Sequence, residues 1–236
     1  MRVRACRCLF CIFIVGLAVL CGYRQSRETM HTVKVLRAPD EEQAFENILC
    51  SCVRLQGEGH YGSGTIYRIT EEQLIIITNK HVLQYFGQDG MVTFFDGKSA
   101  AGKILYLSEE YDLGFLAVDT ASFSKEELSA YAAVVCGSDS YDKLKKNDCI
   151  FMVDIATDLK NPVKHSGEVM NPRKYLEDYG KEMFYGDAYA KEGMSGCGVF
   201  DEYGYYLALL SGGTQYNEIA AVPLNVIETE YKRIKK

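Results

Sequence analysis

The sequence predicts an all-β fold, a barrel or a sandwich built from many short strands. Ten apolar or alternating runs of four to eight residues follow one another from residue 48 onward, and Gly, Asn, Asp and Ser separate them. The chain also contains 17 Tyr and 11 Phe but only 4 Pro, and aromatic residues are frequent in strands. Many short strands with few helical segments are typical of these two architectures.

The predicted elements begin with a polar connector, residues 31–44, that runs into a short helix within residues 39–49. The predicted strands follow at residues 48–55, 64–69, 73–79, 91–95, 103–107, 113–118, 132–136, 149–153, 196–200 and 205–211. The last stretch, residues 223–236, begins with Pro223 and alternates charge at helical spacing, which predicts a C-terminal helix. No repeat or second domain is expected, so residues 45–236 are predicted to form one domain.

Composition and charge exclude several classes of protein. The chain has 236 residues, of which 47% are hydrophobic and 25% charged, as in globular proteins with a sizeable core. The formal net charge is −6 and the pI is about 5.3, which argues against nucleic acid as the main partner.

Residues 1–30 resemble a membrane-directing leader. Three arginines precede an uncharged apolar run, residues 9–22, in the order of a secretory signal. A membrane-spanning helix needs about 20 residues, so a cleaved signal peptide and a short membrane anchor both remain open. We expect an exported protein that is either secreted or tethered to the membrane by residues 9–22.

Three segments contain the groups that hydrolysis by a serine requires. A serine nucleophile needs a base that accepts its proton, a carboxylate that orients the base, and backbone N–H donors for the oxyanion. Ser195 lies in a glycine-rich loop in which the N–H groups of Gly193 and Ser195 could converge on one point. His81 follows an apolar strand, and Asp112 directly precedes another. Each motif is weak alone, but the order His, Asp, Ser at strand ends favours a triad.

This order, with its surroundings, resembles the trypsin-like serine endopeptidases of chymotrypsin fold, most closely the HtrA/Deg branch. The resemblance covers about residues 50–227. It rests on six ordered segments, namely 62–65 (GSGT), 78–82 (TNKHV), 112–116 (DLGFL), 137–148, 187–196 and 221–223. The resemblance implies a double six-stranded β-barrel of the trypsin-like serine protease type, with a short C-terminal helix. The PDZ domain typical of this branch is not expected, because the chain ends soon after the predicted helix.

The resemblance also implies a mechanism. Ser195 would attack the scissile carbonyl, His81 would accept and later deliver the proton, and Asp112 would fix the imidazole tautomer. Backbone N–H groups of Gly193 and Ser195 would form the oxyanion hole. The implied activity is that of a serine endopeptidase acting on protein or peptide substrates, without a metal or cofactor.

The implied substrate pocket is lined by Tyr189, Ser211, Gly212, Gly213 and Ala221. Tyr189 stands where a pocket for Lys or Arg would need an acid, and the wall residues 219–222 are apolar. We therefore expect cleavage after uncharged, small to medium apolar residues such as Val, Ala or Leu.

Two departures from the family pattern leave an alternative open. Met194 stands where the family usually has Asn or Asp, and Cys197 with Gly198 replaces the usual Gly-Pro. The alternative is an inactive or weak pseudoprotease that binds peptides in the same cleft, with Met194 and Cys197 spoiling the oxyanion loop. The remaining cysteines of the domain, Cys50, Cys52, Cys136 and Cys149, are predicted to be small core side chains.

Overall fold

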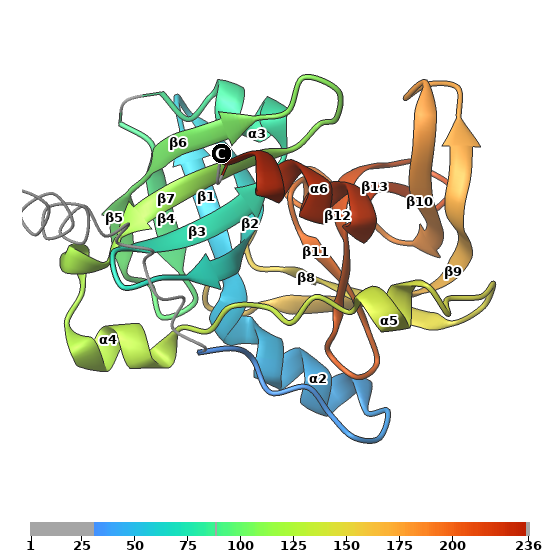
Figure 1. Cartoon of the computed structure of the whole chain (residues 1–236), viewed down its shortest axis with the longest axis horizontal. Coiled ribbons are helices and arrows are strands. Elements are labelled where there is room, and N and C mark those ends of the chain that lie inside the picture. The colour runs from blue at the N-terminus through green and yellow to red at the C-terminus, as the bar shows by residue number, and fades with distance from the viewer. Residues whose placement is uncertain (1–30, 88, 235–236) are drawn as a thin grey trace, which may run out of the picture.

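The computed structural model describes residues 31–87 and 89–234, which form two β-structures packed side by side (Figure 1). The predicted signal or anchor, residues 1–30 with its apolar run 9–22, lies outside these ranges. Within the described ranges, none of the helices combines the length and apolarity needed to cross a bilayer.

The N-terminal β-structure is a curled sheet of seven strands in the order β5-β4-β1-β2-β3-β7-β6. Its strands are β1 (Cys52–Gly57), β2 (His60–Ile69), β3 (Gln73–Thr78), β4 (Met91–Phe94), β5 (Ser99–Ala101), β6 (Lys103–Leu107) and β7 (Gly114–Asp119). β3 pairs antiparallel with β7, and Thr78 stands opposite Gly114. The residues after Thr78 and before Gly114 therefore lie at the same edge of the sheet.

The C-terminal β-structure is a closed barrel in the order β10-β13-β12-β11-β8-β9. Its strands are β8 (Cys149–Asp154), β9 (Val163–Leu176), β10 (Lys181–Ala188), β11 (Gly198–Asp201), β12 (Tyr206–Gly213) and β13 (Glu218–Pro223). The long hairpin of β9 and β10 extends beyond the body of the barrel (Figure 1).

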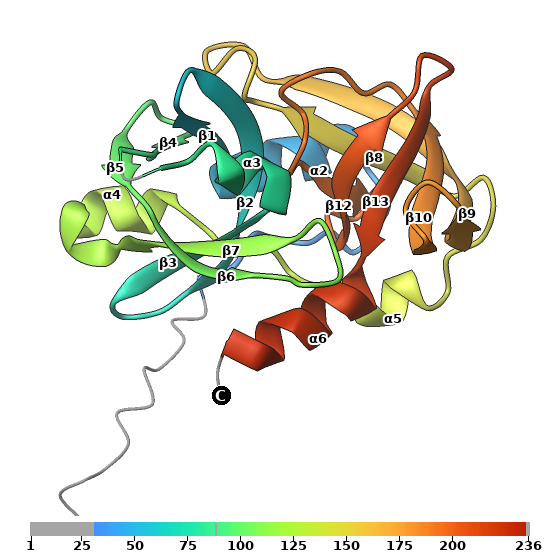
Figure 2. The same ribbon diagram turned by 90° about the horizontal axis from the view of Figure 1, so that it is seen from above.

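Helices connect and cover the two β-structures. They are α2 (Glu41–Ile48), α3 (Lys80–Gln84), α4 (Lys125–Ala130), α5 (Ser138–Tyr141) and α6 (Leu224–Ile234), with 3₁₀ turns η1 (Leu49–Ser51) and η2 (Thr120–Ser122). α6 runs from the end of β13 towards β6 and β7 (Figure 2). There Tyr231 packs against Tyr67 of the N-terminal sheet, with ring centroids 4.9 Å apart. The predicted C-terminal helix thus joins the two β-structures.

The structure confirms the all-β class and the trypsin-like double-barrel arrangement, with local differences that include four strands absent from the predicted set, namely β5, β9, β10 and β13. The N-terminal sheet has seven strands and stays curled where six strands in a barrel were expected. Residues 132–136, predicted to be a strand, form an extended connection with only two isolated bridges, at Ala133 and Cys136. Cys149 was expected in the core but is exposed, because it stands at the start of β8.

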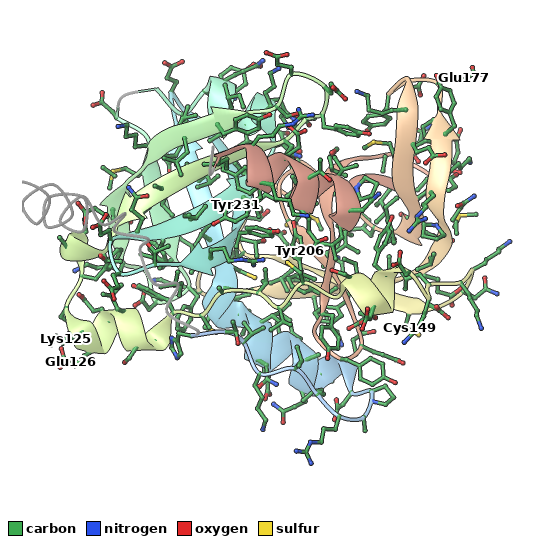
Figure 3. The ribbon with its side chains drawn as sticks, in the orientation of Figure 1. Lys125, Glu126, Cys149, Glu177, Tyr206 and Tyr231 are labelled. Carbon is green, nitrogen blue, oxygen red and sulfur yellow. The ribbon has the colours of Figure 1, made fainter. Side chains whose placement is uncertain are left out.

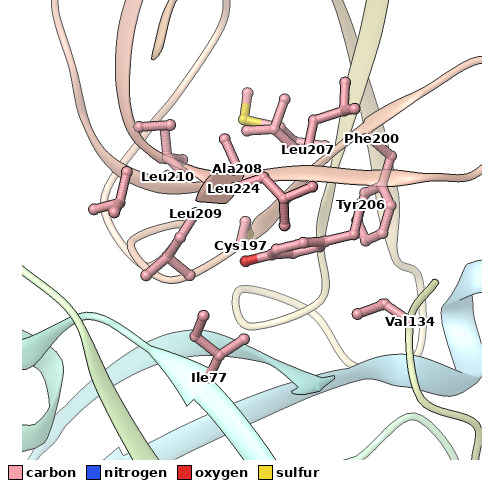
Figure 4. Packing of buried hydrophobic residues seen from close by; sticks show 14 of the residues in the cluster. Ile77, Val134, Cys197, Phe200, Tyr206, Leu207, Ala208, Leu209, Leu210 and Leu224 are labelled. Atoms are coloured by element: carbon pink, nitrogen blue, oxygen red, sulfur yellow. The ribbon is translucent and has the colours of Figure 1, made fainter. Parts of the chain in front are cut away.

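The core of the C-terminal barrel continues to the boundary between the two β-structures. Figure 4 shows Tyr206, Leu209 and Leu210 of β12 packed near Cys197, with Ile77 of β3 facing them across the boundary. All of these side chains are buried. The loop around Ser195 therefore rests on packed side chains from both β-structures.

A buried ion pair anchors the segment that leads to Ser195. Asp154, at the end of β8, has a side chain that is 1% exposed, and its Oδ2 lies 2.8 Å from Lys191 Nζ. Burial alone would raise the pKa of Asp154, but hydrogen bonds from Lys191 and from the Thr157 N–H outweigh it and hold the pKa below its usual value. A lowered carboxyl pKa stabilises the fold above about pH 4, and this contribution is lost as the pH falls through the folded value.

Replacing Lys191 by Met leaves this carboxylate buried without its cation. We expect the free energy of unfolding at neutral pH to fall by about 2 kcal/mol, less than the about 3–5 kcal/mol typical of a broken buried pair, because Lys191 is itself partly hydrated. Urea denaturation between about pH 3 and 8 measures this loss. The deficit should shrink towards the acid end, where Asp154 becomes protonated.

Lys98→Met is the matched control. Lys98 Nζ lies 2.9 Å from Glu127 Oε1, but both side chains are more than a third exposed, so the expected loss is about 0–1 kcal/mol. Equal losses in the two variants would show that Asp154 does not depend on Lys191.

Candidate active site

His81 and Asp112 meet at the shared edge of β3 and β7. His81 lies in the first turn of α3, directly after β3, and Asp112 lies in the loop before β7. His81 Nδ1 is 2.6 Å from Asp112 Oδ2, and the His81 backbone N–H donates to Oδ1 at 2.9 Å. Both carboxylate oxygens of Asp112 therefore bind to His81, one to its backbone and one to its ring, and this fixes the orientation of the imidazole ring relative to the backbone.

Asn79 supports the His81–Asp112 pair through hydrogen bonds of its side chain. Its side chain is fully buried, and its Nδ2 donates to the Asp112 carbonyl oxygen at 2.9 Å and to Ser211 Oγ at 3.4 Å. These bonds connect the loop of Asp112 to β12 of the other β-structure. Asn79 belongs to the TNKHV segment, but nothing in that local pattern indicates a partner in β12.

Ser195 comes from the other β-structure, in the loop between β10 and β11. Ser63 of β2 reaches across to this loop twice. Its N–H donates to the Ser195 carbonyl oxygen at 2.8 Å, and its buried Oγ donates to the Gly193 carbonyl oxygen at 2.9 Å. The sequence motif predicted a role for this segment only by resemblance, because Ser63 and Gly193 are 130 residues apart.

The loop needs glycine at two positions. Gly193 has a φ of 92° and Gly196 a φ of 89°, in the region that favours glycine. A Cβ at Gly193 would also clash with the ring of Tyr61, and one at Gly196 would clash with the Ser63 carbonyl oxygen. The described hydrogen bonds of the loop use the N–H groups of residues 194, 196 and 197. The N–H groups of Gly193 and Ser195 are not among these donors.

The two unusual residues of the loop are both buried. Met194 is 0% exposed and belongs to the core of the C-terminal barrel. The thiol of Cys197 donates to the Val153 carbonyl oxygen at 3.0 Å, and burial raises the pKa of this thiol to about 12. Cys197 therefore stays neutral and fastens the loop to β8, next to Asp154.

His81, Gly193 and Ser195 line one cleft of about 170 Å³. Aromatic side chains form much of its opposite wall, including His60 and Tyr85, whose rings stack 4.0 Å apart. The remaining lining residues are Leu55, Gln56, Gly57, Tyr61, Val82, Phe86 and Glu192. The structure thus brings together, in one cleft, a histidine–carboxylate pair and the serine loop.

None of the five predicted pocket residues lines this cleft, although Gly212 and Gly213 line a second hollow, and the five are not equally accessible. Ser211 and Ala221 are buried in β12 and β13. Tyr189 is 48% exposed, and its ring centroid lies 5.2 Å from that of His165. The expected walls approach closely, because the Ala190 Cβ lies 2.8 Å from the place that a Cβ on Gly213 would take. The two expected walls are therefore in contact, and no open space for a substrate side chain lies between Ala190 and Gly213 in this arrangement.

No metal ligand set is formed within residues 31–87 and 89–234, since no group of three or more His, Cys, Asp and Glu side chains is arranged to hold an ion. The chemistry available in the cleft is that of an imidazole paired with a carboxylate, a hydroxyl and backbone N–H groups. Such groups carry out acyl transfer by general base catalysis.

Comparison with solved structures shows a shared fold. The HtrA-type protease AlgW with a tripeptide superposes with a TM-score of 0.68 at 20% identity, over 83% of this chain and 64% of that one. Deg5 gives a TM-score of 0.63 at 21% identity, over 82% of this chain and 95% of that one. The inactive form of a serine-to-alanine mutant of Rv3671c from M. tuberculosis gives 0.64 at 14% identity, over 86% and 97%. The chain thus spans less than two thirds of AlgW.

A search by sequence among curated proteins finds no match. The family described as trypsin-like peptidase domain, however, matches residues 62–209, which is more than half of the chain and includes His81, Asp112 and Ser195. The chain therefore belongs to the trypsin-like peptidase family of hydrolases, and it shares its fold with HtrA-type proteases.

Proposed function

We propose that this protein is a serine endopeptidase whose triad is His81, Asp112 and Ser195. The observation that carries this proposal is the pairing of His81 Nδ1 with Asp112 Oδ2 at 2.6 Å, in the cleft that Ser195 also lines. That bond places the imidazole proton on Nδ1 and leaves Nε2 to act as a base.

In the proposed reaction each of these groups has one role. The hydroxyl oxygen of Ser195 attacks the scissile carbonyl carbon while His81 accepts the hydroxyl proton, and Asp112 stabilises the imidazolium that forms. The N–H groups of Gly193 and Ser195 donate to the resulting oxyanion. His81 next delivers the proton to the leaving amine, and a water molecule hydrolyses the acyl-enzyme by the same route.

The packing of the loop favours an enzyme over a peptide-binding pseudoprotease. The alternative relies on Met194 and Cys197 disturbing the oxyanion loop, yet both side chains are buried in the core and away from the cleft. Ser63 meanwhile holds the carbonyl groups of Gly193 and Ser195, which supports a loop with its N–H groups available for an oxyanion.

The pocket walls and the leader bear on substrate and location. The apolar residues 219–222 of β13 support cleavage of proteins or peptides after an uncharged, small to medium apolar residue. The basic and apolar pattern of residues 1–30 supports export, with the protein secreted or held at the membrane by residues 9–22.

A fluorophosphonate probe tests the triad directly, because it labels a serine only when that serine is activated. We expect labelling of the wild-type protein and none of Ser195→Ala.

Ser195→Ala and His81→Ala should each lower kcat by about 10⁴–10⁶-fold, and the double variant should be hardly worse, because the two residues act as one unit. Additive losses, or a folded wild-type protein that resists the probe, would contradict the triad.

Ser63→Ala tests the support of the oxyanion loop. The substitution removes the hydrogen bond to the Gly193 carbonyl, so the loop should hold its N–H donors less accurately. We expect kcat to fall by about tenfold while KM changes little, a smaller effect than the about 10²–10³-fold loss caused by deleting an oxyanion donor itself. Steady-state kinetics on a peptide substrate measures both constants.

Ser51→Ala is the control for Ser63→Ala. Ser51 is equally buried, and its Oγ donates to a backbone carbonyl, that of Ile48, at 2.6 Å. It has no bond to the Ser195 loop, so kcat should stay unchanged once the folded fraction is accounted for. A similar loss of kcat in both variants would assign the effect of Ser63 to stability.

A further inference from the structure

The tip of the β9–β10 hairpin is attached to the loop that carries Asp112. Glu177 marks this tip in Figure 3. Lys181 is the first residue of β10 after this tip. Its Nζ donates to the Glu110 carbonyl oxygen and lies 4.4 Å from the centroid of the Tyr111 ring. A segment of the C-terminal barrel is thereby held against the N-terminal sheet beside the proposed triad.

Tyr179 extends from this tip over Gly212 of β12. Its Oη lies 2.9 Å from the place that a Cβ on Gly212 would take. The side chain is half-buried against the core of the barrel. Burial, followed by the charges of Asp112 and Asp178, raises the pKa of the Tyr179 hydroxyl. Tyr179 thus covers Gly212, one of the glycines of the predicted substrate pocket.

A hollow of about 640 Å³ continues from this point between the hairpin and the β12–β13 edge. It is lined by Gly212 and Gly213 on one side and by residues 176–179 on the other. β11 pairs with β12 only as far as Leu209, so the edge of β12 at Gly212 and Gly213 is open on that side. An extended peptide whose scissile carbonyl reaches Ser195 could pair with this edge and place the residues that precede the cut beside the hollow. The width of the hollow at Tyr179 therefore limits those side chains.

Alternation along an extended chain decides which substrate side chain meets Tyr179. Successive side chains of a strand point to opposite sides. The Cβ direction of Gly213 faces Ala190 and that of Gly212 faces Tyr179. A peptide paired with β12 alternates in the same way, so when the residue before the cut lies on the Ala190 side, the next residue towards the N-terminus lies on the Tyr179 side. The hydroxyl end of Tyr179 occupies the space beside Gly212 on that side, where the second side chain would have to fit.

We propose that Tyr179 determines specificity by filling the subsite for the second residue before the scissile bond, so that the enzyme selects Gly or Ala there and rejects large side chains. This inference rests on the proposed function. It assigns no chemical step to Tyr179, whose role is to restrict the shape of the cleft.

The test uses the full-length protein and a set of fluorogenic peptides with Ala before the cut and Gly, Ala, Val, Leu or Phe at the second position. The wild-type protein should cleave the Gly and Ala peptides best. Tyr179→Ala should raise kcat/KM for the Leu and Phe peptides, relative to the Ala peptide, by about tenfold or more, the range expected for the space of a few methylene groups. Tyr179→Phe keeps the ring and should keep the wild-type selectivity.

Tyr175→Ala is the matched control, because Tyr175 is on the same hairpin but 61% exposed and outside the lining of the hollow. It should leave the selectivity at the second position unchanged. If Tyr179→Ala fails to fold, Tyr179→Leu removes the far half of the ring with less loss of packing, and a smaller shift in the same direction is expected.

An active, folded Tyr179→Ala or Tyr179→Leu with the wild-type preference would overturn the inference, as would a wild-type protein that accepts Phe as readily as Ala. A uniform drop for all peptides would assign Tyr179 a structural role only. Failure of the proposed function looks different, because the wild-type protein would then cleave none of the peptides and Ser195 would resist the fluorophosphonate probe.

Discussion

The hydrogen bonds from Ser63 to the loop around Ser195 join the two β-structures at the point where the proposed nucleophile, Ser195, must meet its proposed base, His81. His81 and Asp112 belong to the N-terminal sheet, whereas Ser195 belongs to the C-terminal barrel. A small shift between the two would separate the proposed nucleophile from the base, and such displacements are costly for catalysis. The position of Ser195 therefore depends on contacts across this boundary more than on the loop itself.

Several contacts hold the boundary in place. α6 leaves the barrel and packs Tyr231 on Tyr67 of the sheet, and the carboxylate of Glu230 accepts a hydrogen bond from Tyr106 of β6 at 2.7 Å. Asn79 joins the loop of Asp112 to β12. Through Glu230 and Tyr231, α6 therefore holds the C-terminal barrel against the N-terminal sheet that carries His81 and Asp112.

The local part of the site could be predicted from the sequence, because strongly apolar strands and motifs of adjacent residues are visible there. β3, which leads to His81, is almost entirely buried, and its run of Ile and Leu predicts a strand. The β9–β10 hairpin was missed since β9 is mostly exposed or half-buried and contains Pro172. Contacts such as that of Tyr179 with Gly212 join residues far apart in the chain, so no local pattern indicates them.

Three glycines that line the proposed site are each covered by a side chain from another segment. Tyr61 covers Gly193, Ala190 covers Gly213 and Tyr179 covers Gly212. Because a glycine allows close approach of a neighbour, the backbone at these positions can remain the same while the covering residue varies. The shape of the cleft then depends on residues that lie outside the triad and outside the family motifs. On this argument, the proposed triad would cut the peptide bond, and the residues that cover the glycines would determine which peptide fits.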